Sequence, residues 1–600
     1  MSDYTASIKD ALFTLRTIGQ IEELSKTERF AHADYETVAS VLEEQGKFMQ
    51  EVFGGCSVEG DTVGLTFDKG TVTVPAGFKT AYKKFVDAGW QGIGSQVDYG
   101  GAGFPGSVFL QSLEFMTASN AALTMCPGLT VGAVEALEHW GSEEQKETYL
   151  PKLVTGEWSG TMNLTEPHAG SDVGLCTTKA EPQADGTYKI TGTKIFISFG
   201  EHDMADNIIH LVLARIVGAP PGTKGISLFI VPKFLVNDDG SLGERNDVNC
   251  VSIEHKMGIH SSPTCVLSYG DEGGATGLLI GEENQGMRAM FTMMNAARIA
   301  VGIQGVAIGD AAYQKALQYS TERLQGKEIG GEGHGPVAII AHPDVRRMLL
   351  TMRSLIDAMR SIIVYNSSAL DFAAAHGNAE DAEHWREIAE LITPVTKAWC
   401  TDMGMEVTST AIQVYGGMGY IEESGVSQHF RDMRIAPIYE GTNGIQAMDL
   451  VGRKLPMRMG GVVNEHLQRI RDLDSELADA GEAFAGIRTS LAEGVEKLTT
   501  ATQWIFEHGL GNPKDALSGA TPYLRMFGSV TGAWLLARQA LAANAELAAG
   551  SSDTAFLQAK ITSAKFFATQ LLPQTFGLLP SITAGSEILF EIDAEGLRSW

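Results

Sequence analysis

The chain has 600 residues, of which 44% are apolar and 20% are charged, and its formal net charge is −28 at pH 7. One hydrophobic core does not organise a chain of this length, so we expect two to four domains. The apolar content excludes an intrinsically disordered protein, and the acidic balance argues against non-specific binding to nucleic acid or to anionic membranes.

The first residues and the cysteines predict a cytoplasmic protein. The N-terminal sequence MSDYTASIKD lacks the basic and apolar regions of a signal peptide. No charge-poor apolar run is expected to reach the roughly 18 residues of a transmembrane helix. The six cysteines are scattered without a CxxC pair, so neither a zinc site nor a disulfide framework is predicted.

The spacing of apolar residues divides the chain into four predicted domains. Residues 1–157 have apolar positions at helical spacing and predict an N-terminal helical domain. Residues 158–283 hold short alternating segments between turn residues, which is typical of a small antiparallel β domain, a barrel or a sandwich. Residues 284–460 return to the helical period of a bundle, and residues 461–600 form an additional helical block. The predicted fold class is mainly α with a central β domain.

Three local patterns add detail to this division. A polar helix is expected to start near Gly141-Ser142 and to end near Gly156. In the bundle we expect separate helices at 379–400 and 404–415, the second ending at Gly416-Gly417. The C-terminal block carries 10 Lys/Arg against 16 Asp/Glu and has no visible catalytic pattern, so we interpret it as packing or interface material.

The stretch IAPIYEGTNGIQ, residues 435–446, contains the strongest candidate for a catalytic group. A short apolar run leads into Glu440, and Gly441-Thr442-Asn443-Gly444 then turns the chain into a helix. We expect a carboxylate at the junction of a strand-like segment and a helix. Burial beside apolar groups raises the pKa of a carboxyl group, which suits a general base near neutral pH. The alternative is a solvated loop glutamate.

Two other segments carry groups that a ligand could use. The loop 164–172, LTEPHAGSD, collects hydroxyls and glycine-exposed amides, which bind anions and polar rings well, although plain turns have the same composition. Arg298 lies among small residues, where a guanidinium needs either a buried partner or an anionic ligand.

Taken together, these segments resemble the acyl-CoA dehydrogenase family. The motifs TEPxAGSD, KIFIS, ER…GK, QxxGG and IYEGT occur in the family's order, and the resemblance covers about residues 90–455. The extra length at both ends resembles the family's long subgroup, whose chains have about this length. The resemblance implies an N-terminal helical domain, a middle β-barrel, a helical bundle, an extra C-terminal helical domain and FAD as the cofactor.

The resemblance also assigns roles to individual residues. Glu440 matches the base that removes the α-proton of the thioester, while a β-hydride passes to N5 of FAD and a trans-2-enoyl-CoA forms. Some family members place the base one residue before Arg298, but that position is Ala297 here, so Glu440 is the remaining candidate. The residues matched to FAD contacts are Leu164, Thr165, Phe196, Ser198, Arg323, Gln413, Gly416, Gly417 and Thr442. Those matched to substrate contacts are Ser171, Asn295, Arg298 and Gly441.

The chain departs from the family pattern near the expected flavin. Phe196 and Ser198 stand where the family usually has Trp and Thr, and Met162 replaces a frequent Tyr or Cys. The aromatic residue that the family has between Gln325 and Gly326 is absent. Phe196 and Ser198 preserve an apolar face and a hydroxyl donor but leave the tuning of the flavin open. Met162 weakens one expected contact, and the adjacent Gln325 and Gly326 imply a different local geometry.

The acyl group and the oxidant remain open at this stage. We favour 3-(methylthio)propanoyl-CoA, from dimethylsulfoniopropionate breakdown, over short- to long-chain fatty acyl-CoA of β-oxidation. Electron-transfer flavoprotein is the expected acceptor, and an acyl-CoA oxidase that uses O₂ is the alternative. The family also implies a homo-oligomer, here a homodimer, without a nucleic-acid or membrane partner and without a metal. A catalytically idle, nucleic-acid-binding relative would need a basic C-terminal block, and this block is acidic.

Overall fold

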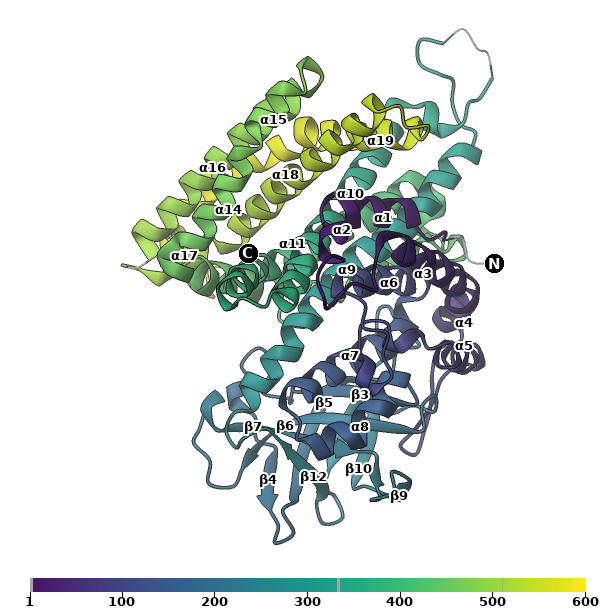
Figure 1. Ribbon diagram of the computed structural model, residues 1–600, viewed down its shortest axis with the longest axis vertical. Coiled ribbons are helices and arrows are strands. Elements are labelled where there is room, and N and C mark those ends of the chain that lie inside the picture. Colours follow the sequence, from purple (N-terminus) through teal and green to yellow (C-terminus); the bar gives the residue numbers. More distant parts are fainter. Residues whose placement is uncertain (1–3, 332–334, 510, 600) are drawn as a thin grey trace. The chain divides into compact units, whose positions relative to one another are not determined.

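The computed structural model describes residues 4–331, 335–509 and 511–599 (Figure 1). The chain divides into two compact units. The first contains Val41–Ala300 and the residues before Ser7, and the second contains Ser7–Ser40 and the chain from Val301 onward. Long helices and a single β domain confirm the predicted fold class. The predicted domain boundaries stay predictions.

The helices of the first unit come mainly before its sheet. α8 (Glu143–Thr155) begins at a capping box of Ser142 and Gln145 and ends at Gly156, whose φ of 83° favours glycine. Both ends agree with the predicted start and end of this helix. The other elements are the part of α3 (Tyr35–Phe48) from Val41 onward, α4 (Ser57–Thr62), α5 (Ala76–Asp87), α6 (Gly106–Ser119), α7 (Ala121–Trp140) and the hairpin of β1 (Thr66–Asp68) and β2 (Thr71–Thr73).

The β domain of the first unit is a barrel. Its strand order is β10-β11-β5-β12-β7-β6-β3, and β4 pairs with both β5 and β6, which closes β5, β12, β7, β6 and β4 into a ring. The strands are β3 (Trp158–Asn163), β4 (Lys179–Pro182), β5 (Tyr188–Ser198), β6 (Asn207–Ile216), β7 (Ile226–Pro232), β10 (Val248–Ile253), β11 (Thr264–Tyr269) and β12 (Ala275–Ile280), with a separate hairpin of β8 (Phe234–Val236) and β9 (Leu242–Arg245).

The prediction of a purely antiparallel domain is wrong in one respect. β6 pairs in parallel with β3 and with β4. A parallel pair needs a long connection between its strands, and the segment between β3 and β6 supplies one because it contains the loop 164–172 and two further strands. The loop 164–172, whose hydroxyls and amides could bind a ligand, is therefore part of the crossover connection between β3 and β6.

β6 is buried along most of its length because it separates two cores. Leu211 and Leu213 pack with residues of α7 and α8, whereas Val212 and Ala214 belong to the barrel interior. α7 and α8 lie against β3 on the outer side of the barrel (Figure 1). These contacts hold the end of β3 in place, and that end leads directly into the loop 164–172.

Buried polar pairs line β3 on its other face. Ser159 Oγ bonds His202 Nε2 at 2.9 Å, and Thr161 Oγ1 bonds His210 Nδ1 at 2.8 Å. Burial lowers the pKa of both histidines to about 3, so both rings are neutral at pH 7.

The second unit consists of long packed helices. α11 (Ala379–Tyr415) is continuous, so the predicted helices 379–400 and 404–415 are one helix. Glycine weakens an isolated helix, but a Cβ on Gly404 would lie 2.7 Å from the Cα of Gly305 on α9 (Gly286–Glu322). These glycines let α9 and α11 approach closely, and the close packing maintains the helix.

The remaining helices of the second unit pack on α10 and α11 or on α16 and α18. α18 packs on α10, α11, α16 and α19 (Figure 1, green to yellow). The bounds are α1 (Ile8–Thr17), α2 (Ile21–Leu24), α10 (Pro343–Ala375), α12 (Val426–Met433), α13 (Asn443–Asp449), α14 (Gly461–Asp472), α15 (Asp474–Asp479), α16 (Ala485–Gly509), α17 (Pro513–Ser518), α18 (Ala520–Ala548), α19 (Thr554–Phe566) and α20 (Leu579–Ile582).

A buried ion cluster, formed by Asp10, Arg353, Asp357 and Lys560, joins three helices of the second unit. Lys560 of α19 lies 2.5 Å from Asp10 of α1 and 2.8 Å from Asp357 of α10. Arg353 of α10 lies 2.5 Å from Asp10 and 3.2 Å from Asp357. Burial favours a raised pKa for both carboxyl groups, but the neighbouring cations hold each pKa below its usual value. The cluster ties the first helix and the C-terminal block to the bundle.

α9 corrects one expectation about hydrophobic length. Within the described part of the chain it is the one helix long and apolar enough to cross a membrane. However, 56% of its most apolar stretch is buried inside the protein, which is typical of a core helix. We therefore interpret α9 as a core helix. All six cysteines are buried and have free thiols.

Candidate active site

The loop that carries Glu440 corrects the sequence analysis. Residues 435–439 form tight turns after α12 in place of the predicted strand-like segment, with the amide of Ile438 donating to the carbonyl of Ile435 at 2.8 Å. Glu440 is half-buried and has a φ of 55°, and Gly441 follows with a φ of 81°. A positive φ is unfavourable for a residue with a side chain, so the surroundings must hold Glu440 in this conformation.

Neighbouring side chains hold the Glu440 loop from two sides. Tyr439 Oη donates to Gln304 Oε1 of α9 at 2.5 Å. The buried amide of Gln446 donates to the carbonyls of Glu440 and Gly441 at 3.2 and 3.3 Å. These contacts reach the phenol of Tyr439 and the carbonyls of Glu440 and Gly441, so they fix the backbone of the loop that carries the Glu440 carboxylate.

Asn443 fastens the same loop to α11. Its side-chain amide donates to the carbonyl of Ala398 at 3.1 Å and to Asp402 at 2.7 Å, and its oxygen accepts from the buried Lys397 at 2.8 Å. Asn443 thus links the turn after Glu440 to three residues on adjacent turns of α11.

We expect Asn443→Ala to destabilise the second unit by about 1–3 kcal/mol, because buried partners on α11 lose their hydrogen bonds. Urea unfolding of the purified protein measures this change. Asn464→Ala, at an exposed position, is the matched control and should stay within about 0.5 kcal/mol of the wild type. Equal stability of the two variants would contradict the fastening role.

Thr442 has a local structural role. Its hydroxyl oxygen accepts the amide of Ile445 at 3.2 Å and so caps α13. A hydroxyl that accepts this bond still has a hydrogen to donate. The local geometry is compatible with the predicted flavin diphosphate contact, and the cap explains why Thr suits this position.

The other candidate residues of the second unit are open to a ligand. Arg323 and Gln413 are exposed. A Cβ added at Gly416 or Gly417 would meet nothing within 4 Å, so the backbone there is free for close approach. An exposed guanidinium and bare backbone are the groups that fit the phosphates of FAD.

In the first unit, the loop after β3 pairs with the end of β5. The amide of Ile195 donates to the carbonyl of Thr165 at 2.9 Å. Leu164, Thr165 and Ser198 are half-buried, whereas Phe196 has a φ of 60° and is 59% exposed. An exposed aromatic ring beside hydroxyls and backbone amides fits a planar polar ring such as the isoalloxazine of FAD.

The candidate substrate residues of the first unit have different surroundings. Ser171 and Asn295 are exposed. Arg298 is only 4% exposed, and its Nη1 lies 3.4 Å from Asn295 Oδ1. Asn295 is thus one polar neighbour of Arg298, but it is exposed, so the choice between a buried partner and an anionic ligand stays a prediction.

The structure places the candidate residues in both units. Those in the first unit are Leu164, Thr165, Ser171, Phe196, Ser198, Asn295 and Arg298, and those in the second are Arg323, Gln413, Gly416, Gly417, Glu440, Gly441 and Thr442. Sequence reasoning missed the residues that hold the loops, namely Glu166, Lys194, Asn443 and Gln446. The signal for Lys194 was a cation inside the apolar alternation of KIFIS.

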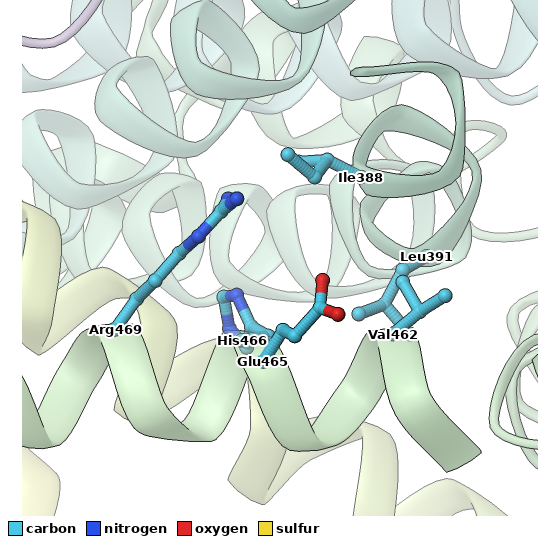
Figure 2. A pocket seen from close by; sticks show the side chains of 6 residues that line it. All are labelled: Ile388, Leu391, Val462, Glu465, His466 and Arg469. Carbon is cyan, nitrogen blue, oxygen red and sulfur yellow. The ribbon is translucent and has the colours of Figure 1, made fainter. Parts of the chain in front are cut away.

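A small pocket in the second unit includes none of these residues in its lining. It is lined by Ile388, Leu391, Val462, Glu465, His466 and Arg469 (Figure 2). His466 is buried and bonds Thr531 Oγ1 at 3.0 Å, and burial lowers its pKa to about 3. A histidine with this pKa stays neutral and is a weak base at pH 7, so we interpret it as a packed core residue.

Three buried neutral histidines predict a loss of stability in acid. Because the pKa values of His202, His210 and His466 are lowered by folding, the unfolded chain binds more protons below pH 6.5. Each histidine should remove about 1.4 kcal/mol of stability per pH unit as the pH falls from about 6.5 towards 3. Urea unfolding at pH 7.5 and 5.5 should show a smaller loss for His466→Phe than for the wild type. The exposed His139→Gln variant is the control.

Four family models match consecutive parts of the chain. They describe the N-terminal domain (residues 43–157), the middle domain (161–271) and the C-terminal domain (284–455) of acyl-CoA dehydrogenases, and an acetyl-CoA dehydrogenase C-terminal-like domain (466–593).

Known proteins resemble the chain over nearly its whole length. A 3-methylmercaptopropionyl-CoA dehydrogenase of Ruegeria pomeroyi is 44% identical over 95% of this chain and 96% of its own. A butyryl-CoA dehydrogenase of Syntrophomonas wolfei is 35% identical over 99% of both chains.

Solved structures share the fold. Caenorhabditis elegans ACDH-11 in complex with C11-CoA has a TM-score of 0.78 at 19% identity, covering 99% of this chain and 96% of its own. A Bacillus anthracis acyl-CoA dehydrogenase complexed with FAD has a TM-score of 0.68 at 21% identity, covering 99% and 91%.

The fold and these similarities define a flavin-dependent oxidoreductase that acts on CH–CH bonds. The chain belongs to the acyl-CoA dehydrogenase family, in its long form with an additional C-terminal helical domain.

Proposed function

We propose that this acyl-CoA dehydrogenase uses Glu440 as its general base and oxidises 3-(methylthio)propanoyl-CoA. The observation that carries the assignment of the base is the half-buried carboxylate of Glu440, held at a positive φ by the amide of Gln446. The substrate rests on the 44% identity to the Ruegeria pomeroyi enzyme, whose name gives the same acyl group.

The chain's residues divide the work of the reaction. Glu440 removes the proton from Cα of the thioester and becomes a neutral carboxylic acid, while the Cβ–H bond gives up a hydride. FAD, when bound, supplies the acceptor for that hydride. Thr165 and Ser198 hold the flavin ring by hydrogen bonds, with Leu164 beside them, and the ring of Phe196 covers it.

The remaining candidates bind the charged ends of cofactor and substrate. Arg323 and Thr442 contact the FAD pyrophosphate, and Gln413, Gly416 and Gly417 approach the FAD of a second subunit. The substrate contacts are Ser171 for the CoA moiety and Asn295, Arg298 and Gly441 near the thioester. A guanidinium suits a diphosphate because it donates two parallel hydrogen bonds.

Arg323→Ala should weaken FAD binding roughly tenfold or more, because charge-assisted hydrogen bonds to the pyrophosphate are lost. Gel filtration followed by the flavin absorbance measures the FAD that remains bound. Arg346→Ala removes another exposed arginine and serves as the control. Full FAD occupancy of Arg323→Ala would show that this arginine does not bind the pyrophosphate.

The substrate test is an anaerobic titration of the purified protein with 3-(methylthio)propanoyl-, butyryl-, octanoyl-, palmitoyl- and isobutyryl-CoA. Bleaching of the flavin band reports dehydrogenation, and we expect the fastest bleaching with 3-(methylthio)propanoyl-CoA. A faster reaction with butyryl-CoA or a longer thioester would favour a fatty acyl-CoA dehydrogenase. Bound flavin without bleaching by any thioester would contradict the proposed function.

We further propose a cytoplasmic homodimer that passes its electrons to electron-transfer flavoprotein. Oxygen consumption during turnover distinguishes this dehydrogenase from an acyl-CoA oxidase. Dimethylsulfoniopropionate catabolism is the proposed setting, because its breakdown yields the methylthio thioester.

A further inference from the structure

A buried ion pair joins the loop 164–172 of the first unit to β5. Lys194 Nζ lies 2.8 Å from Glu166 Oε1, and both side chains are at most 1% exposed. Glu166 also accepts the amides and hydroxyls of Thr177 and Thr178, at 2.6 to 3.1 Å. The carboxylate of Glu166 thus accepts hydrogen bonds from Lys194, Thr177 and Thr178, and these bonds fix the ion pair at the end of the barrel.

Lys194 contacts the backbone of the loop as well as Glu166. Its ammonium donates to the carbonyl of Leu164 at 3.0 Å. The next residue of the strand, Ile195, donates its amide to the carbonyl of Thr165 at 2.9 Å. Two consecutive loop carbonyls are therefore held by two consecutive residues of β5, and Phe196 follows immediately.

The energetics of the pair point to a role in placement. Replacing a buried ion pair by apolar groups of similar volume is often neutral or stabilising, so stability alone does not account for it. Its distinctive contact is the bond to Leu164, which apolar residues cannot make. Burial lowers the pKa of Lys194, and the charge of Glu166 opposes that shift.

We propose that Lys194, paired with Glu166, is a positioning residue that holds the Leu164–Thr165 backbone and the Phe196 segment in one arrangement for the flavin ring. This inference rests on the proposed flavin contacts of Leu164, Thr165 and Phe196. Lys194 acts through the loop carbonyl and touches neither substrate nor reacting atoms. Without Lys194, the loop keeps the hydrogen bond from Ile195 to Thr165 but loses the hydrogen bond to the carbonyl of Leu164.

The test compares Lys194→Met with the double variant Lys194→Met/Glu166→Gln. Lys194→Met leaves Glu166 charged without its cation, so it should lower both the urea midpoint of the apoprotein and the FAD affinity. The double variant removes the unpaired charge and should regain most of the apoprotein stability. Its FAD affinity should stay reduced, roughly tenfold or more, and the visible absorption and circular dichroism of the flavin should stay shifted.

Lys189→Met is the matched control, because Lys189 lies on the same strand and its Nζ bonds Thr276 Oγ1 at 3.0 Å, away from the loop. It should bind FAD as the wild type does. Wild-type FAD affinity and spectrum in the double variant would overturn the proposal, as would an equal loss in Lys189→Met. The double variant carries the test if Lys194→Met does not fold.

These readouts separate the inference from the proposed function. FAD affinity and the flavin spectrum are measured without a substrate. A wild type that binds FAD but is bleached by no thioester contradicts the proposed function alone. A wild type that binds no FAD overturns the positioning role as well.

Discussion

Glu440→Gln is expected to keep FAD bound and to lose acyl-CoA turnover by about 10²–10⁴-fold. The amide has nearly the shape of the carboxylate but does not accept the α-proton of the thioester. The contacts of Gln446, Tyr439 and Asn443 that hold the loop do not use the Glu440 carboxylate, so the substitution leaves them intact. Loss of turnover should therefore occur without loss of the folded loop.

Anaerobic bleaching of the flavin band by 3-(methylthio)propanoyl-CoA measures this effect in a single turnover. Glu423→Gln, which removes an exposed carboxylate of the same unit, should bleach at the wild-type rate. If Glu440→Gln bleached within a few-fold of the wild type, another group would have to be the base. The flavin absorbance before substrate addition confirms that both variants contain FAD.

Lys560→Met is expected to destabilise the second unit by roughly 3–5 kcal/mol. Asp10 and Asp357 are both buried, and Lys560 is one of the two cations that contact both of them. Its removal leaves Arg353 and the more distant Arg360, which lies 3.8 Å from Asp357, so the two carboxylates lose a direct charge partner. The free energy of unfolding in urea at pH 7 measures the loss.

Lys565→Met is the control on the same helix, since Lys565 is only half-buried and lies over the ring of Phe484. It should change stability by less than about 1 kcal/mol. If Lys560→Met also lost less than about 1 kcal/mol, water or neighbouring groups would have to compensate the two carboxylates. The buried ion cluster would then contribute little to the stability of the second unit.

Local signals predicted elements whose determinants lie close together in the chain. The capping residues Ser142 and Gln145 and the terminal Gly156 all lie within α8 or next to it, and both ends of this helix were predicted. The predictions that were wrong concern segments whose structure depends on contacts with distant parts of the chain. The predicted break before Gly404 does not occur, because α9 packs so closely against α11 at this point that only a glycine fits opposite Gly305. The run before Glu440 coils because α12 precedes it and Asn443 pulls the turn onto α11.

The candidate site shows the same division. Glu440 was predicted from its motif, but its positive φ depends on Gln446, whose side chain reaches back to the loop carbonyls. Lys194 was missed because a lysine in a strand normally faces solvent, and its partner Glu166 lies far from it in sequence. Motifs identify groups that touch a ligand, whereas the groups that support them emerge only from the three-dimensional arrangement.

The buried ion cluster has a consequence for how the protein is made. Asp10 is synthesised long before Lys560, yet both belong to one buried cluster. Arg16 and Glu546, 530 residues apart, form another pair between the same regions. α1 therefore lacks Lys560 and Glu546 as charge partners until α18 and α19 have been synthesised, although Arg353 of α10 is available to Asp10 earlier. The second unit is completed only after α18 and α19 emerge, whereas the barrel of the first unit contains strands from a continuous stretch and can close earlier.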